Sequence, residues 1–168
     1  MVKHTVINLE TKGFRPTFFD LTDDVKKAVS DSGISNGPVV VFTGHTTCSI
    51  FFEEYTHDTD ICGYDYLQVD LVNGLNKIFP KELTNDQYYR YPGPKHLAFA
   101  LEIDPDIMSD GTLVNGDAHL KGTLIGSSCT FPIIDKSVLT GEWGHIYLVD
   151  WDGNRPRKRK AVITVTGE

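Results

Sequence analysis

The sequence contains only three cysteines, and no two of them lie in the Cys-x-x-Cys spacing that is typical of metal and redox sites. Cys48, Cys62 and Cys129 are scattered and odd in number, which suits a reducing compartment. The chain also lacks an apolar run of the roughly 20 residues that a membrane-spanning helix needs. Its N-terminal segment has no long apolar core of the kind found in signal peptides. We therefore expect a cytoplasmic protein with no membrane partner.

Positive charge is scarce as well. The 168 residues include 16 lysines and arginines against 23 aspartates and glutamates, which gives a net charge of −7. This balance argues against a general nucleic-acid binder or a protein of anionic membrane surfaces. The one basic cluster is RPRKRK at 155–160. It is either a solvated hairpin arm or a clamp for phosphate or pyrophosphate, which the planar donors of arginine suit.

The length and an ordinary 40% hydrophobic content predict one domain over residues 1–168. Strands outnumber helices in the apolar patterns, so we expect an α+β fold built on an antiparallel sheet or sandwich. The run PVVVFTG is continuously apolar, which predicts burial on both faces. The predicted strands cover 4–10, 14–20, 38–44, 46–54, 96–103, 130–134, 145–151 and 160–166. The predicted helices cover 21–33, 64–79 and 115–126.

The polar stretch NGDAHLKGTLIGSS at 115–128 has the pattern of a short capped helix. Asn115 is a favourable N-cap, and Asp117 lies in the first turn, where a carboxylate complements the helix dipole. Asp117 and Lys121 are four residues apart and share one face. His119 points elsewhere, and nothing in the local pattern requires an imidazole there.

A second histidine, His45, follows the predicted strand 38–44 and precedes Thr46 and Thr47. Together with His119 and a carboxylate it could form a metal site with open positions, or an acid–base pair near neutrality. The spacing favours neither hypothesis. A cysteine-nucleophile hypothesis for Cys48 is weaker, because Cys48 lies on the apolar face of its strand.

The alternation of side chains in the segment TTCSIFFEE predicts the orientation of the two glutamates at its end. If Ile50 and Phe52 face the core, the period of two sends Glu54 inward too. A buried carboxylate needs a partner, which would place Glu54 in a polar site. The alternative is a strand that ends at Phe52 and leaves Glu53 and Glu54 solvated.

Four segments (45–54, 115–128, 130–153 and 155–165) resemble the successive blocks of the YjbQ-like family, in the family's order and over most of the chain. Members of that family are uncharacterised or are credited with secondary thiamine-phosphate synthase activity. The resemblance implies a compact α+β domain with a β-sandwich-like core that assembles as a homotrimer. It also implies a polar site close to a subunit interface.

The resemblance further implies roles for individual residues. The implied catalytic residues are His45, Glu54, Asp117 and His119. The implied substrate-binding residues are Thr46, Thr47, Asn115, Lys121, Trp143, Arg157 and Arg159. A divalent metal, Mg or Zn, would be held by His45 and His119. The sequence departs from the family at Glu53 and Glu142, which replace an asparagine and a threonine, and at 95–113, which has the character of an insertion.

The leading hypothesis for function follows from this resemblance. The chain would join a pyrimidine methyl pyrophosphate to a thiazole phosphate and release pyrophosphate, so its partner would be a small phosphorylated molecule. Two alternatives remain. One is a non-enzymatic trimeric protein that binds a metal or a small anion, and the other is a metal-dependent hydrolase that uses the two histidines.

Overall fold

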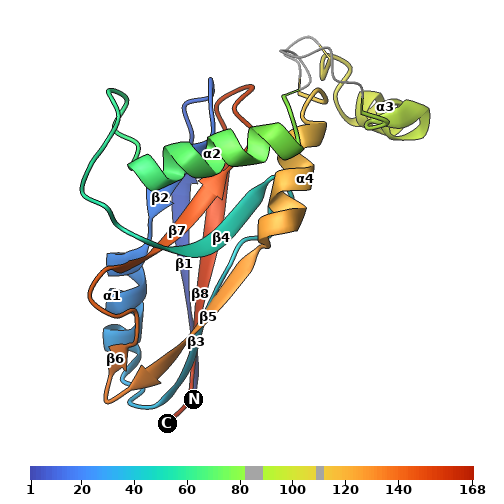
Figure 1. Ribbon diagram of the computed structural model, residues 1–168. Coiled ribbons are helices and arrows are strands. Elements are labelled where there is room, and N and C mark those ends of the chain that lie inside the picture. Colours follow the sequence, from blue (N-terminus) through green and yellow to red (C-terminus); the bar gives the residue numbers. More distant parts are fainter. Residues whose placement is uncertain (82–88, 109–111) are drawn as a thin grey trace.

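The computed structural model describes residues 1–81, 89–108 and 112–168, and these residues form an α+β fold of two antiparallel sheets with four helices (Figure 1). The larger sheet has the strand order β1-β8-β3-β5-β6 and the smaller one β2-β7-β4. The predicted α+β class and the antiparallel pairing are confirmed.

Residues 96–103 are helical where a strand was predicted, and the strand at 137–138 was not predicted; the other elements differ from the predicted ones mainly at their ends. The strands are β1 (Val2–Glu10), β2 (Thr17–Asp20), β3 (Gly37–Phe42), β4 (Cys48–Glu54), β5 (Ser128–Ile134), β6 (Ser137–Val138), β7 (Gly144–Asp150) and β8 (Lys158–Thr166). The helices are α1 (Thr22–Ser32), α2 (Tyr66–Ile78), α3 (Gly93–Ile103) and α4 (Gly116–Ile125).

The three-stranded sheet is the central layer of the molecule. In β7 every residue from Ile146 to Asp150 is buried. Leu148 packs into the core between this sheet, the five-stranded sheet and α1. Tyr147 and Val149 point the other way and pack with residues of α2 and α4. Because both faces are covered, β7 has the continuous apolar character of a fully buried strand.

The five-stranded sheet buries only one of its faces. Along β3, Val39 and Val41 are fully buried, whereas Val40 is partly exposed and Phe42 is 44% exposed. The prediction that PVVVFTG is buried on both faces is therefore wrong. The outer face of this sheet is accessible to solvent in the single chain. A run of apolar residues does not show whether one face or both faces of a strand are covered.

The helices begin and end largely where the sequence signals lie. Gly33 closes α1 in a left-handed conformation with a φ of 74°, which glycine adopts without steric cost. The side chain of Asp65 caps α2 by accepting a hydrogen bond of 2.9 Å from the amide of Leu67. Figure 1 shows α2 lying across the three-stranded sheet and α3 extending away from the body. No helix in the described residues is long and apolar enough to span a bilayer.

The segment HLAFALEI is helical, so the predicted strand at 96–103 is wrong. It lies in α3, where the only buried residue is Ala100. Alanine, leucine and glutamate favour helices, and Ile103 is the only β-branched residue of the segment. An apolar run of this length has no period that separates the two conformations. Residues 109–111 of the range 95–113 lie outside the described residues, and the insertion itself stays a prediction.

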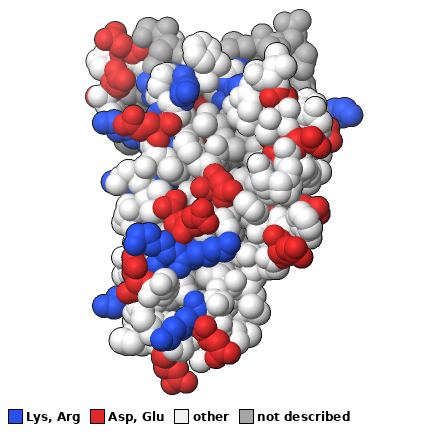
Figure 2. Space-filling view, turned by 90° about the vertical axis from the view of Figure 1, so that its left-hand side faces the viewer, with Lys and Arg blue, Asp and Glu red and all other residues white. Residues whose placement is uncertain are grey.

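Charged side chains of both signs share the surface. On the face shown in Figure 2, a group of basic side chains lies directly beside acidic ones. Within β8 the exposed charges are Lys158 and Lys160, while Arg159 is buried between them. The basic cluster 155–160 is therefore divided between the surface and the interior.

Two helical glycines differ in the space around them. A Cβ atom on Gly122 of α4 would lie 2.7 Å from the carbonyl oxygen of Thr46, so the helix rests directly on the loop before β4. A Cβ atom on Gly74 of α2 would meet nothing within 4 Å. The contact at Gly122 is between backbones and cannot be relieved by a change of rotamer.

We predict opposite effects for alanine at these two positions. Gly74→Ala should raise the free energy of unfolding by about 0.5–1 kcal/mol, because alanine has the higher helix propensity. Gly122→Ala should lower it by about 1–3 kcal/mol, because the added methyl group forces α4 away from Thr46. Urea denaturation measures both values. A stabilised Gly122→Ala variant would contradict the close packing of α4.

Candidate functional site

His45 and His119, which come from different parts of the chain, line the same cavity, which we call the histidine cavity. It has a volume of about 290 Å³ and opens where the loop after β3, the segment before α4 and the β7–β8 connection meet. Its lining comprises Gly44, His45, Thr46, Thr47, Tyr91, Thr112, Leu113, Asn115, His119, Asp152, Arg157 and Arg159. Seven of the predicted site residues are in this list.

His45 is held by the backbone of the neighbouring strand. Its Nε2 atom accepts a hydrogen bond of 3.1 Å from the amide of Lys160. An Nε2 atom that accepts carries no proton, so this bond assigns the Nδ1–H tautomer to the neutral ring. The pKa of His45 is lowered, first by burial and then by the charge of Arg159. His45 is thus a neutral donor through Nδ1 near pH 7.

His119 lies in α4 with its ring centroid 5.0 Å from that of Tyr91. Its pKa is also lowered, mainly by burial, although Asp152 opposes the shift. Both imidazoles therefore remain neutral at pH values where a free histidine begins to take up a proton. Tyr91 was not predicted from the sequence, and it carries no local signal.

The arginines of the basic cluster are paired with two buried carboxylates. Arg159 donates from Nε to Asp150 at 2.7 Å and from Nη2 to the hydroxyl of Thr47 at 3.1 Å. Arg157 donates from Nη2 to Asp152 at 2.8 Å, while its buried Nε has no hydrogen-bond partner among the described residues. Neither arginine lies in a solvated hairpin arm. Asp150 ends the buried strand β7, and Asp152 lies two residues after it. A carboxylate at the end of a buried strand is the same sequence pattern from which a buried Glu54 was predicted.

Asn115 lies between the histidine cavity and a neighbouring one. The helix-capping role of its side chain is wrong, because the side chain makes no cap hydrogen bond. Its Nδ2 instead donates to Asp152 at 3.0 Å, and its Oδ1 is buried without a partner in the described part of the chain. Its backbone carbonyl accepts from the amides of Ala118 and His119 and starts the helix.

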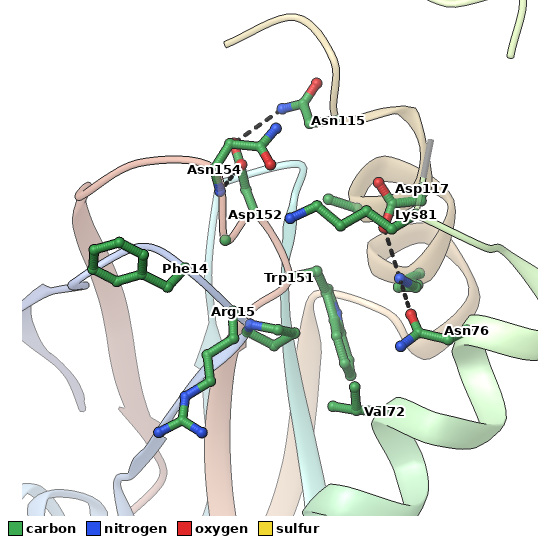
Figure 3. Close-up of a pocket in the computed structure, with 14 residues that line it drawn as sticks. Phe14, Arg15, Val72, Asn76, Lys81, Asn115, Asp117, Trp151, Asp152 and Asn154 are labelled. Atoms are coloured by element: carbon green, nitrogen blue, oxygen red, sulfur yellow. Dashed lines mark hydrogen bonds and ion pairs between the residues drawn. The ribbon is translucent and has the colours of Figure 1, made fainter. Parts of the chain in front are cut away.

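The neighbouring cavity, which we call the tryptophan cavity, holds the predicted ion pair of α4 (Figure 3). The Nζ atom of Lys121 lies 2.7 Å from Asp117 and 2.8 Å from the Oδ1 atom of Asn76. The pair is confirmed and buried. Lys121 and Asp117 line this cavity of about 220 Å³ beside Trp151, and neither is among the residues that line the histidine cavity.

Two predicted site residues, Glu54 and Trp143, lie at the other end of the three-stranded sheet. Glu54 pairs with Gly144, whereas Cys48, at the cavity end of β4, pairs with Asp150. At about 3.3 Å per residue these two ends of β4 are roughly 20 Å apart. Trp143 is 53% exposed. In one chain these residues do not join the histidine cavity.

The inward orientation predicted for Glu54 is wrong. Glu54 shares a face with Ile50 and Phe52, but that face leaves the core before the strand ends, so Phe52 and Glu54 are exposed. Glu53 points to the opposite face and is half-buried, and its buried Oε2 has no hydrogen-bond partner among the residues that the structure describes. Burial, assisted by the charge of Asp65, raises the pKa of Glu53 to about 7.

The chemistry available in the cavity is that of hydrogen-bond donors. Cys48 is buried, and burial raises the pKa of its thiol, so it is no thiolate nucleophile at neutral pH. Residues 1–81, 89–108 and 112–168 contain no group of three histidine, cysteine or acidic side chains placed to hold a metal ion. The Nε2 lone pair of His45 is already engaged. The Nε–H of Arg157 and the Nδ1–H of His45 are donors from which an anion can accept.

The sequence and the fold are similar to those of proteins that are already known. The model of the family described as UPF0047 protein YjbQ-like matches residues 5–168. The chain belongs to the YjbQ-like family. A UPF0047 protein of Methanocaldococcus jannaschii is 27% identical to it over 154 residues, which are 92% of this chain and 88% of the relative. YugU of Bacillus subtilis is 24% identical and covers 91% of this chain and 92% of its own length.

Solved structures agree with this assignment of the YjbQ-like chain. A YbjQ-like protein of unknown function from Sulfolobus solfataricus superposes with a TM-score of 0.66 at 26% identity, and the match covers 100% of both chains. An uncharacterised YjbQ/UPF0047 protein from Clostridium acetobutylicum gives a TM-score of 0.63 at 31% identity, over 94% of this chain and 97% of that one.

We predict that the two glutamates of the YjbQ-like chain differ in how they affect stability with pH. The folded-state pKa of Glu53, about 7, lies above the 4.5 of an unperturbed glutamate. The folded state therefore binds more protons between these values, and this contribution to stability is lost as the pH rises through the same window. Glu53→Gln should raise the melting temperature at pH 8 and change it little at pH 4.

Glu54→Gln is the matched control because its side chain is exposed. It should leave the melting temperature unchanged at both pH values. The measurement is thermal denaturation followed by circular dichroism. Equal shifts for the two variants at pH 8 would show that Glu53 is solvated in the folded protein.

Proposed function

We propose that the histidine cavity binds a small phosphorylated molecule and acts on it as an enzyme. The observation that carries this proposal is the convergence of His45, His119 and Arg157 on one cavity. The buried Nε–H of Arg157 has no partner in the residues described, and a buried donor without a partner is costly. A phosphate oxygen would satisfy it with a charge-assisted hydrogen bond.

The surroundings of the cavity favour an anion in two further ways. Helix α4 begins beside Asn115, so the positive end of its dipole lies at the cavity wall. Arg157 and Arg159 are each paired with one aspartate, which keeps the guanidinium groups fixed in position before any ligand arrives. Preorganised donors of this kind stabilise developing negative charge without rearrangement.

The family resemblance supplies the reaction that we propose for this site. The thiazole ring nitrogen attacks the methylene carbon of the pyrimidine methyl pyrophosphate, and the new C–N bond forms as the C–O bond breaks. The departing pyrophosphate keeps the electron pair. Donors from His45, His119 and Arg157 stabilise its charge, and the cavity holds the two reactants together. Lys121 has a positioning role, since it fixes Asp117 in the neighbouring cavity.

A second candidate function rests on the neutral state of the two imidazoles. Neutral histidines can act as metal ligands or as bases, which would suit a metal-binding protein or a metal-dependent hydrolase. The two candidates differ in their pH dependence. Binding of an anion directly to the imidazoles strengthens as they become protonated, which their lowered pKa values place below the ~6.5 of free histidine, whereas binding through a metal weakens there.

We also propose that the chain acts as a cytoplasmic homotrimer. Large apolar side chains are exposed on the single chain at Phe42, Phe52, Leu120, Leu124 and Trp143, by between 38% and 56%. Apolar surface of this kind is typical of a face that a partner covers. An adjoining subunit could then bring its Glu54 and Trp143 towards the histidine cavity. Sedimentation equilibrium should give three times the chain mass, and a stable monomer at micromolar concentration would contradict the proposal.

We predict that His119→Ala abolishes function without loss of stability. Its affinity for inorganic pyrophosphate should fall at least about tenfold, a change worth about 1.4 kcal/mol. Formation of thiamine phosphate from the two substrates should be lost. The melting temperature should stay unchanged or rise slightly, because alanine favours a helix more than histidine does. Calorimetric titration, a product assay and thermal denaturation measure the three quantities.

His4→Ala provides the control, since His4 lies exposed in β1 and is bonded only to Thr164 among the described residues. It should leave pyrophosphate binding intact. Loss of stability in His119→Ala together with intact binding would show that the histidine is structural. Pyrophosphate binding without product formation would leave an anion-binding protein, and binding that requires added metal and weakens below pH 6.5 would favour the metal-dependent candidate.

A further inference from the structure

A third cavity is lined by aromatic rings and shares no lining residue with the histidine cavity. We call it the aromatic cavity. It has a volume of about 240 Å³ and lies between β2, β7, the end of β4 and the N-terminus of α2. The side chains that matter here are Phe18, Asp20, Tyr55, Tyr64, Asp65 and Tyr147. Neither histidine of the proposed site is among its lining residues.

The aromatic residues of the lining form two groups of neighbouring rings. The centroids of Phe18 and Tyr64 are 5.6 Å apart and meet edge to face. On the other side, His145 lies 5.0 Å from Tyr55 and 6.1 Å from Tyr147 and so connects these two rings. The face of an aromatic ring carries negative charge density, which attracts a cation placed over it.

Two carboxylates complete the lining, and each accepts hydrogen bonds from neighbouring groups. Asp65 accepts from the amide and the hydroxyl of Thr56 at 2.9 and 2.6 Å, in addition to capping α2. Asp20 accepts from the amide of Thr22 at 2.9 Å and is paired with His145 at 2.6 Å. The pKa of Asp20 is lowered despite burial because of these bonds.

The charge around the aromatic cavity is negative on balance. The pKa of Tyr147 is raised, first by burial and then by the carboxylates of Asp20 and Asp65. The buried Oε2 of Glu53 has no partner within the described residues. A cation beside the lining is Arg15, whose guanidinium lies 4.0 Å from the centroid of Tyr64. Its side chain points away from the tryptophan cavity in Figure 3.

These features discriminate among possible ligands. An anion would meet two carboxylates and the negative faces of the rings. A neutral apolar ligand would remove water from the carboxylates without offering them a donor, which is costly. A positively charged ligand is attracted by both the rings and the carboxylates, and the pairing of Arg15 with Tyr64 shows that one of these rings already holds a cation on a face.

We infer that the aromatic cavity binds a small organic cation, an amine or a quaternary ammonium ion. The volume of about 240 Å³ lies below the usual range for drug-sized ligands, about 300–1,000 Å³, and suits a compact head group. The site is separate from the histidine cavity and does not depend on the function proposed for it.

Choline chloride is a suitable probe, and 3,3-dimethylbutan-1-ol is its uncharged counterpart of the same shape. In calorimetric titrations of the full chain, choline should bind at least about tenfold more tightly than the alcohol. Equal affinities would show that only apolar contact matters, and no choline binding at millimolar concentration would overturn the inference.

Variants of the lining test whether the rings and the charge carry the affinity. Tyr55→Leu should weaken choline binding about tenfold, whereas Tyr55→Phe keeps the ring face and should bind nearly as well as the unchanged protein. Asp20→Asn should weaken it too, while Glu10→Gln, at an exposed position in β1, should not. Thermal denaturation checks that each variant is folded. If Tyr55→Leu is unfolded, the affinity of Asp20→Asn for choline tests the inference instead.

The outcome is independent of the proposed function. His119→Ala should leave choline binding unchanged, and Tyr55→Leu should leave pyrophosphate binding unchanged. Choline binding that disappears in His119→Ala would place the cation in the histidine cavity and overturn the inference. Pyrophosphate binding without choline binding would overturn it while the proposed function stands.

Discussion

The ion pair between Asp150 and Arg159 is the interaction on which the rest of the site depends. Asp150 ends β7 in the central sheet, Arg159 belongs to β8 in the large sheet, and both are buried. The guanidinium binds both carboxylate oxygens, at 2.7 and 3.1 Å, and also holds the hydroxyl of Thr47. Loss of one partner would leave the other charge buried and unpaired, which typically costs 3–5 kcal/mol. The same ion pair thus joins the two sheets and forms part of the wall of the histidine cavity.

The glutamates at the end of β4 show how much the alternation of a strand can predict from the sequence. The alternation in β4 correctly places Ile50 and Glu54 on one face, but it cannot reveal where the covering layer stops. The face that holds Glu53 continues to be covered beyond that point, by α2 and the loop before it. The same reasoning applied to Asp150 and Asp152 predicts buried carboxylates that need partners, but it does not identify Arg159 and Arg157 as those partners.

Local pairs could be derived from spacing, whereas meetings between distant segments could not. The ion pair of Asp117 and Lys121 follows from helical geometry and is present. Which cavity that helix face lines depends on how α4 rests on Thr46, a tertiary contact that no sequence period encodes. The approach of His45 and His119 to one cavity is of the same kind, and the family resemblance supplied it as an expectation.

The chain carries two tryptophans, and their environments are opposite. Trp151 is 3% exposed, donates from Nε1 to the hydroxyl of Ser49 at 2.9 Å and lines a cavity next to the histidines. Trp143 is 53% exposed and lies at the far end of the same sheet, beside His57. The intrinsic fluorescence of the protein therefore has two separable sources. A soluble quencher reaches Trp143 but not Trp151. The change in emission therefore reports at which end of the sheet a ligand or a neighbouring subunit binds.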